Sequence, residues 1–363
     1  MRLEVGRRTL LEIESLAAGG EGIARAEGWV VFVPRTAPGD TWRVEIREVR
    51  RRYARARPIE RLRAGPGRRE PPCPYVGRCG GCDWMHLDEA TQRRWRERIL
   101  CDALVRIGRQ GALPSIQTLA SPAPFGYRSR ARVLYARRKV GFRARRSQAL
   151  VSVERCIVLD AATQRALDAL VARPPQGRGE REIRGYGDAV AVAGRTLRVG
   201  PHAFFQANRA LWSAWLRKVA ELCGEGEMAL ELYAGVGFYT SVLMERFRRV
   251  IAVEAGPAAE DLAVNCAAEV VRTRAEHWLP ITGRRLQPEV VLMNPPRRGC
   301  DARVVEALRV LSPRRIVYVS CDPTTLARDL AGLEGVFSLS QLWVLDALPQ
   351  TSRIETIAVL ERC

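Results

Sequence analysis

The sequence predicts an α/β protein with three parts: a small N-terminal β-barrel, a β-rich central region and a C-terminal doubly wound parallel sheet. Three observations predict this fold. Short β-like runs broken by glycine fill the first 63 residues, three cysteines follow within ten positions, and strand and helix patterns alternate from about residue 201. A chain of 363 residues is long enough to bury several cores. We therefore expect domains at residues 1–63, 64–200 and 201–363.

The N-terminal region has the pattern of an OB-like β-barrel. Its runs TLLEIESL, WVVFVP and TWRVEIREVRRRYARARPIERL are separated by turn residues, as in small barrels. The last run carries a dense series of arginines from Arg50 to Arg63, which predicts an edge that faces phosphates. The stretch AGPGRREPP that follows predicts a linker, because neither helix nor strand tolerates so much glycine and proline.

The charge of the chain predicts a polyanionic partner. Its 59 basic and 40 acidic side chains give a net charge of +19, and nearly all the basic residues are arginine, which binds phosphate and stacks on bases. RNA is the partner that this composition favours. The first residues lack the apolar run of a secretory signal, and no stretch has the length of a membrane span. We therefore expect a cytoplasmic protein without a membrane partner, and no pattern in the chain indicates an obligate protein partner.

The central region contains a cysteine cluster typical of a metal site. CPYVGRCGGCDWMH places Cys73, Cys79 and Cys82 close together around two glycines, with His86 four residues later. A cytoplasmic chain uses such thiols for metal binding or catalysis, not disulfides. The spacing suits a Cys₃His zinc site, or an iron–sulphur cluster that takes its fourth thiolate from Cys156 in VSVERC. Spacing alone leaves both open.

In the third region, strand-like and helix-like segments alternate. MALELYAG precedes VGFYTSVLMERF, PEVVLMNPP precedes ARVVEALRVL, and RRIVYVSC precedes PTTLARDLAGL. This alternation predicts a parallel sheet covered by helices, whose ligands bind beyond the carboxyl ends of the strands. Gly235 and Gly237 at one such end let the backbone approach a ligand, and Glu254 at the next can accept hydrogen bonds from ribose hydroxyls. Because the third glycine of the dinucleotide pattern is missing, S-adenosylmethionine is favoured over NAD.

A thiol follows another predicted strand, in YVSCDPTTLARDL. Asp322 can cap the helix that Pro323 begins, which places Cys321 beside a helix N-terminus that lowers a thiol pKa. The charge of Asp322 opposes this effect. In isolation the thiol has the pattern of a small buried side chain at a strand end.

Together these motifs resemble the RNA (uracil-5-)-methyltransferases, and in particular the iron–sulphur, TRAM-containing type that methylates 23S ribosomal RNA. The resemblance rests on segments that occur in the family's order: CPYVGRCGGCDWMHLDEATQ, FGYRSRAR, GFRARRSQALVSVERC, FFQAN, NPPRRG, YVSCDPTTLARDL and LPQTSRIETIAVLER. It implies a TRAM barrel that binds RNA, a central iron–sulphur domain and a Rossmann-like methyltransferase domain that uses S-adenosylmethionine.

The resemblance also implies roles for single residues. Cys73, Cys79, Cys82 and Cys156 match the ligands of a 4Fe–4S cluster, which leaves His86 as a structural neighbour. Gln206, Tyr233, Glu254 and Asn294 match S-adenosylmethionine contacts, and Phe204 matches an aromatic that packs on the target base. Cys321 matches the nucleophile that adds to C6 of uracil, and Glu355 matches the base that removes the C5 proton. A closed pocket would raise the pKa of that carboxylate towards neutrality. The arginines of 128–132 and 138–146 are candidates for contacts with flanking phosphates.

Three positions depart from the family pattern. Asn294 replaces an acidic residue, so cytosine stays open as an alternative to uracil. Phe238 replaces an asparagine of the cofactor loop. Arg353 replaces a histidine two residues before Glu355, where its charge would lower the carboxylate pKa. The sequence also leaves open a transfer RNA substrate, and a non-catalytic protein that only binds RNA.

Overall fold

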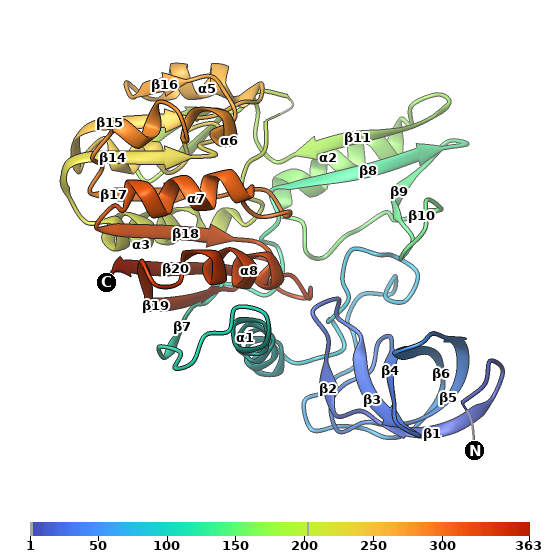
Figure 1. Ribbon diagram of the computed structural model, residues 1–363. Helices are drawn as coiled ribbons and strands as arrows, with labels where there is room; N and C mark the ends of the chain where they lie inside the picture. The colour runs from blue at the N-terminus through green and yellow to red at the C-terminus, as the bar shows by residue number, and fades with distance from the viewer. Residues whose placement is uncertain (1–2, 202) are drawn as a thin grey trace.

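The computed structural model describes residues 3–201 and 203–363. Its strands form sheets of six, four, two and eight strands, which follow one another along the chain apart from one strand (Figure 1). The predicted α/β class and its N-terminal β-strand domain are confirmed. Within the described residues, no helix combines the length and apolar character that crossing a membrane requires.

The N-terminal sheet has the strand order β1-β5-β6-β4-β3-β2 and curls around its own core (Figure 1). Alternate residues point inward, so that Val44 and Ile46 are fully buried beside Val31 and Ala54. Three register shifts between β5 and β6 bend these long strands around the core. The strands are β1 (Arg8–Glu12), β2 (Ser15–Leu16), β3 (Gly22–Ala26), β4 (Trp29–Val33), β5 (Thr41–Val49) and β6 (Tyr53–Arg63).

The central region starts with residues 65–88, which contain the cysteine-rich segment and have no regular helix or strand. Helix α1 (Glu89–Arg106) begins after Asp88, whose carboxylate accepts a hydrogen bond from the Thr91 amide. A four-stranded antiparallel sheet, in the order β10-β9-β8-β11, packs against helix α2 (Ala161–Ala172), and a hairpin follows it. These strands are β8 (Arg130–Ala136), β9 (Lys139–Arg143), β10 (Leu150–Ser152), β11 (Arg178–Arg184), β12 (Ala189–Val192) and β13 (Arg195–Arg198).

The largest sheet has eight strands in the order β16-β15-β14-β17-β18-β20-β19-β7. The strands from β16 to β18 are parallel, whereas β20 runs antiparallel to both of its neighbours. The strands are β7 (Ile116–Leu119), β14 (Gly226–Leu232), β15 (Phe247–Val253), β16 (Glu269–Val271), β17 (Val290–Met293), β18 (Arg315–Ser320), β19 (Phe337–Leu345) and β20 (Glu355–Arg362).

Helices cover both faces of this sheet. Alternate strand residues, such as Val290 and Val317, pack on one side against Trp212 and Trp215. Their neighbours pack on the other side against α1, α7 and α8. The helices that follow the hairpin are η1 (Arg209–Leu211), α3 (Trp212–Cys223), α4 (Thr240–Leu243), α5 (Ala258–Asn265), α6 (Ala275–Trp278), η2 (Gly283–Arg285), α7 (Ala302–Leu311) and α8 (Pro323–Leu333).

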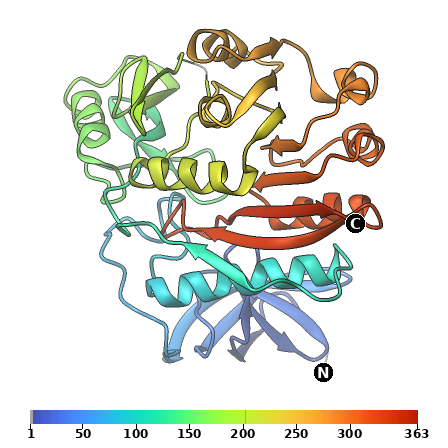
Figure 2. The same cartoon turned by 90° about the vertical axis from the view of Figure 1, so that its left-hand side faces the viewer.

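One strand of the large sheet comes from the central region. β7 pairs with β19 in parallel, with Leu342 opposite Ile116 and Leu345 opposite Leu119. Figure 2 shows β7 and α1 lying between the barrel and the C-terminal strands. The expected boundary between 64–200 and 201–363 therefore does not separate the sheets, because β7 is the edge strand of a sheet whose other strands begin only at Gly226.

Candidate active site

A cavity of about 770 Å³ opens at the carboxyl ends of β14, β15, β17 and β18. This is the edge at which open α/β sheets bind their ligands. Nearly all the predicted cofactor, substrate and catalytic residues line it, namely Phe204, Gln206, Tyr233, Gly235, Glu254, Asn294, Cys321 and Glu355. The structure therefore brings together side chains that lie as much as 151 positions apart in the sequence.

The glycine loop after β14 has two glycines with different surroundings. Both have a positive φ, 58° at Gly235 and 88° at Gly237. A Cβ on Gly235 would meet no atom within 4 Å, whereas one on Gly237 would lie 2.8 Å from the Cys266 sulphur and 2.9 Å from Leu262 Cδ1. Gly235 thus borders the cavity, while Gly237 allows the loop to pack on α5 and does not line the cavity.

Glu254 links two strand ends beside this loop. One carboxylate oxygen accepts from the Gly235 amide at 2.9 Å, and the other accepts from the Gly256 amide at 2.7 Å. Each oxygen keeps a further lone pair for a ligand hydroxyl. A side cavity of about 160 Å³ next to it is bordered by Tyr233, Glu254 and Pro296.

Three buried polar atoms on the cavity wall have no hydrogen-bond partner among the described residues. They are the Tyr239 hydroxyl, the Trp215 indole nitrogen and the Asn208 Oδ1. Buried polar groups in proteins are nearly always satisfied, by protein atoms or by an ordered water, so these atoms are places where a buried water would bind. Nothing in the sequence distinguishes Trp215 from the neighbouring Trp212, and sequence reasoning missed all three.

Phe238 belongs to an aromatic cluster under the cavity. Its ring packs edge-on against Phe205 and Tyr239, with centroids 5.3 and 5.0 Å apart. The side chain that replaces the family's asparagine is therefore a packing residue. The unpartnered Tyr239 hydroxyl beside it is a polar group that sequence reasoning did not anticipate.

Cys321 and Glu355 are brought together by the strand register. Ser320 at the end of β18 pairs with Thr356 of β20. Cys321 directly follows Ser320 and Glu355 directly precedes Thr356, both side chains line the cavity, and the charge of Glu355 acts on the Cys321 thiol. The thiol and the carboxyl therefore lie side by side on the cavity wall.

The two groups have raised pKa values. Burial raises the pKa of Glu355 to about 8, although Arg297 and Arg353 both lower it. The lowering effect expected of Arg353 is thus present but does not dominate, and the upward direction agrees with the prediction for a closed pocket. Burial, followed by repulsion from Glu355, raises the pKa of Cys321 to about 11, while Arg297 lowers it. Because Glu355 is neutral below about pH 8, its repulsion of the thiolate disappears there.

The expected help from the helix N-terminus is not what sets the Cys321 pKa. Asp322 does cap α8, but its carboxylate accepts the hydrogen bonds of the Thr324 and Thr325 amides itself. Those amides are therefore satisfied, and the Asp322 charge adds to the raised pKa of the thiol. Arg297 is the nearby positive charge that acts on both groups, and sequence reasoning did not single it out.

The base-contact candidates lie at the cavity rim. Phe204 is 66% exposed, and the Arg130 guanidinium lies 5.4 Å from its ring centroid. Gln206 is half-buried and its carbonyl accepts from the Trp212 indole at 2.9 Å. Asn294 follows β17 directly, and its backbone amide donates to the Leu232 carbonyl, which leaves its side chain at the cavity.

A second cavity, of about 790 Å³, is lined by Cys73, Cys79, Cys82 and Cys156. All four are free thiols, and burial raises the pKa of Cys79, Cys82 and Cys156. Three cysteines of one segment and a fourth from a distant one, all on one cavity, are a donor set that suits an iron–sulphur cluster. Within residues 3–201 and 203–363, however, no group of three or more His, Cys, Asp or Glu side chains is placed to hold a metal ion.

His86 is not part of this cavity. Its imidazole is buried, with Nε2 3.1 Å from the Thr36 carbonyl oxygen of the barrel, and burial lowers its pKa to about 4. The zinc arrangement of three cysteines with His86 is therefore not formed.

Arginines line the region where the two cavities adjoin. Arg128, Arg132 and Arg297 border both of them. Arg132 is paired with Glu180 at 2.9 Å, whereas Arg128 and Arg297 have no ion pair with any described carboxylate. Their positive charge is thus available to an anionic ligand that spans the two cavities.

The fold and the site define a methyltransferase with an N-terminal TRAM domain. Residues 2–59 match the TRAM domain family, and residues 273–363 match the family described as tRNA (Uracil-5-)-methyltransferase. The 23S rRNA (uracil(1939)-C(5))-methyltransferase RlmD of Pseudomonas putida is 32% identical over 99% of this chain and 95% of its own length. An uncharacterized RNA methyltransferase of Bdellovibrio bacteriovorus is 31% identical over 98% of this chain and 95% of its own length. The chain belongs to the RNA (uracil-5-)-methyltransferase family.

A solved structure supports the fold. The Pyrococcus abyssi tRNA (uracil-54, C5)-methyltransferase, in complex with S-adenosyl-L-homocysteine, superposes with a TM-score of 0.76. The match covers 98% of this chain and 100% of that one, at 23% identity. The similarity extends through all three regions, so the arrangement of barrel, central region and large sheet is that of a known methyltransferase fold.

Proposed function

We propose that this enzyme methylates C5 of a uridine in 23S ribosomal RNA, with S-adenosylmethionine as methyl donor and Cys321 as covalent nucleophile. The observation that carries the proposal is the position of Cys321 beside Glu355, on the wall of a cavity that Glu254 also lines. Ribosomal RNA is favoured over transfer RNA by the full-length relatives named as 23S rRNA enzymes. Such a substrate also favours the cytoplasm as the place of the reaction.

Each proposed step is assigned to a residue of the chain. The Cys321 thiol loses its proton to solvent, and the thiolate forms a bond to C6 of the uracil, which makes C5 nucleophilic. S-adenosylmethionine, when bound, supplies an electrophilic methyl group. C5 takes this methyl group while its bond to the sulphonium breaks. Glu355, whose carboxyl first gives its own proton to solvent as the pH approaches its pKa of about 8, then removes the C5 proton, the C6–sulphur bond breaks, and the ring double bond and the thiolate are restored.

Cofactor and base are held by the remaining cavity residues. We assign the methyl donor to Gln206, Tyr233, Gly235, Glu254 and Asn294, with the ribose hydroxyls donating to the Glu254 carboxylate. Phe204 at the rim can stack on a base that has left its helix, as enzymes that act on bases require. Asn294 can accept from uracil N3–H through its oxygen, or donate to cytosine N3 through its amide.

Methyl transfer to unmodified RNA tests this proposal. The protein, prepared without oxygen, is incubated with methyl-labelled S-adenosylmethionine and either unmodified 23S ribosomal RNA or transfer RNA, and labelled nucleosides are identified. We expect 5-methyluridine from ribosomal RNA only. Label in transfer RNA would overturn the assignment of ribosomal RNA as the substrate, and 5-methylcytidine would overturn the assignment of uracil as the target base. Cys321→Ala should abolish labelling and retain RNA binding.

We also propose that Cys73, Cys79, Cys82 and Cys156 hold a 4Fe–4S cluster. The support is the composition of their cavity, in which four thiols and no histidine are available. Because the proposed methyl transfer involves no electron transfer, we assign a structural role to the cluster that these cysteines would hold. Iron and acid-labile sulphide at about four atoms each per chain, both lost in Cys82→Ser, would support the cluster. Zinc in their place would refute it.

We propose that residues 1–63 contact RNA outside the active site, that 64–200 position the cluster and the flanking nucleotides, and that 201–363 bind the methyl donor. The strand β7 and helix α1 belong structurally with the last part. Arg128 and Arg297, between the two cavities, are the arginines best placed to bind phosphates next to the target nucleotide.

A further inference from the structure

The loop of residues 346–354, between β19 and β20, leads directly into Glu355. It contains Gln350, a fully buried side chain whose φ of 69° is unusual for a residue other than glycine. Such a backbone conformation persists only where the surroundings fix it. The loop that presents Glu355 is therefore held by contacts outside itself.

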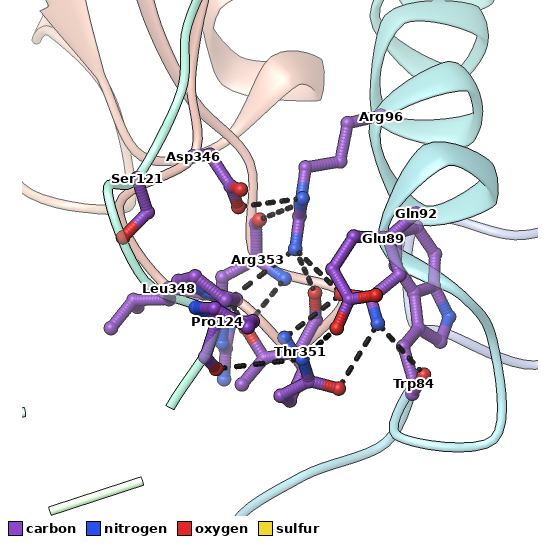
Figure 3. A network of polar contacts seen from close by, with 12 residues as sticks. Trp84, Glu89, Gln92, Arg96, Ser121, Pro124, Asp346, Leu348, Thr351 and Arg353 are labelled. Carbon is purple, nitrogen blue, oxygen red and sulfur yellow. Dashed lines mark hydrogen bonds and ion pairs between the residues drawn. The ribbon is translucent and has the colours of Figure 1, made fainter. Parts of the chain in front are cut away.

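Helix α1 supplies most of these contacts through Arg96. The Arg96 side chain is only 1% exposed. It donates to three backbone carbonyls of the loop, those of Leu348 at 3.3 Å, Thr351 at 2.9 Å and Arg353 at 3.2 Å. It also forms an ion pair with Asp346 at 2.8 Å, and Figure 3 shows the guanidinium between the helix and the loop. Arg96 thus contacts the loop from its first residue to a point two residues before Glu355.

A second set of contacts fixes Gln350 itself. The backbone N–H of Gln350 donates to Gln92 Oε1 at 2.9 Å, and its backbone carbonyl accepts from the Trp84 backbone N–H at 3.0 Å. Its side-chain oxygen accepts from Arg69 at 2.7 Å and from Gln92 at 3.1 Å. Because backbone and side chain are both satisfied, the unusual φ is fully determined by α1 and the segment before it.

The geometry of arginine suits this position better than that of lysine. A guanidinium directs five N–H groups in fixed directions in one plane, so that one side chain can reach several separate acceptors. A lysine ammonium carries its donors on a single atom and cannot span carbonyls that belong to Leu348, Thr351 and Arg353. Replacement by lysine would keep the charge opposite Asp346 but lose some of the hydrogen bonds to the loop carbonyls.

We propose that Arg96 is a positioning residue for Glu355, which holds the 346–354 loop so that the carboxylate meets the C5 proton of the methylated base. This inference rests on the proposed function, in which Glu355 removes that proton. It assigns to a helix of the central region a direct influence on one chemical step. Formation of the Cys321 adduct depends on β18 and should not need Arg96. Breakdown of the adduct depends on Glu355 and should therefore need Arg96.

The test separates formation and decay of the covalent enzyme–RNA adduct. A fragment of unmodified 23S ribosomal RNA is mixed with excess enzyme and S-adenosylmethionine, and the adduct is followed over time on denaturing gels. Arg96→Lys is compared with Arg94→Lys, the same change on an exposed arginine of α1. Glu355→Gln marks the behaviour without the base, and Cys321→Ala must give no adduct.

We expect Arg96→Lys to form the adduct within about threefold of the unmodified rate and to decay roughly ten- to a hundredfold more slowly, the range that a misplacement of about 1 Å produces. Asp346→Asn removes only the ion pair and should show a smaller effect in the same direction, which serves if Arg96→Lys fails to fold. Equal loss of formation and decay, or no difference from Arg94→Lys, would overturn the positioning role. If Glu355→Gln does not accumulate adduct, the base itself is misassigned, and both proposals fail.

Discussion

The glycine loop after β14 offers a paired test, because its two glycines have opposite surroundings. We consider Gly235→Ala and Gly237→Ala, which make the same chemical change two residues apart. A Cβ on Gly235 would enter open cavity space, whereas a Cβ on Gly237 would press on Leu262 of α5 and on Cys266, the residue that follows α5. The first change should therefore affect ligand binding and the second should affect the free energy of unfolding.

The expected losses in the free energy of unfolding follow from the φ angles of the two glycines and from the close contacts at Gly237. Alanine in the left-handed region costs about 1–2 kcal/mol, and this applies to both positions. Contacts of 2.8 and 2.9 Å at Gly237 add an overpacking cost of about 1–3 kcal/mol. The melting temperature should fall by roughly 3–7 °C in Gly237→Ala and by about 1–3 °C in Gly235→Ala. Because a methyl group in the cavity competes with the cofactor, Gly235→Ala should weaken S-adenosylhomocysteine binding by roughly tenfold or more, or about 1.4 kcal/mol.

Thermal unfolding and calorimetric titration with S-adenosylhomocysteine measure the two effects separately. Titration is done well below the melting temperature of each variant, so that only folded protein is compared. A loss of affinity at unchanged stability in Gly237→Ala, or unfolding of Gly235→Ala as early as that of Gly237→Ala, would contradict these expectations. Either result would mean that the loop approaches its ligand through Gly237.

Three further predictions concern single residues. The pKa of Glu355 is raised to about 8, so between about pH 4.5 and pH 8 the folded protein holds a proton that the unfolded chain has released, and the free energy of unfolding should fall across this range. Glu355→Gln should therefore stabilise the protein more at pH 9 than at pH 5, as measured by urea unfolding. An equal effect at both pH values would contradict the raised pKa. Phe204→Ala should weaken RNA binding by about 1–3 kcal/mol in a filter-binding assay and leave S-adenosylhomocysteine affinity unchanged, because its exposed ring is available to stack on a base. Asn294→Asp should retain methylation of uridine and lose any methylation of cytidine, since a carboxylate cannot donate to cytosine N3; label in cytidine from this variant would exclude Asn294 as the residue that reads N3.

Local patterns predicted several elements correctly. The segments ARVVEALRVL and PTTLARDLAGL form α7 and α8 over the same residues, since an aspartate cap and an amphipathic pattern define each helix within the sequence itself. The helix expected from VGFYTSVLMERF is reduced to α4, because the chain turns after Leu243 to begin β15 at Phe247. Where tight geometry shortens an element, periodicity alone does not reveal it.

The site was predictable where motifs end strands, and not where distant segments meet. Cys321 and Glu254 follow predicted strands, so their place at the sheet edge could be inferred. The raised pKa of Cys321 could not, because it depends on burial and on a carboxylate 34 positions away. Arg96 is likewise invisible in the sequence, where it stands among similar arginines of α1 and only its burial distinguishes it. Long-range contacts set these properties, and no local pattern encodes them.

The pairing of β7 with β19 has a consequence for synthesis of the chain. The two strands are separated by about 220 residues, so the ribosome makes β7 and the apolar face of α1 long before their partner. At roughly 5–20 residues per second, these segments wait on the order of ten seconds or more without the sheet that covers them. Leu100 and Leu104, which are fully buried in the finished protein, lack most of their packing partners during this interval. A chain that stops before α8 lacks Leu326 and Leu330, which share the core of Leu100 and Leu104, so the apolar face of α1 is covered only once synthesis is nearly complete.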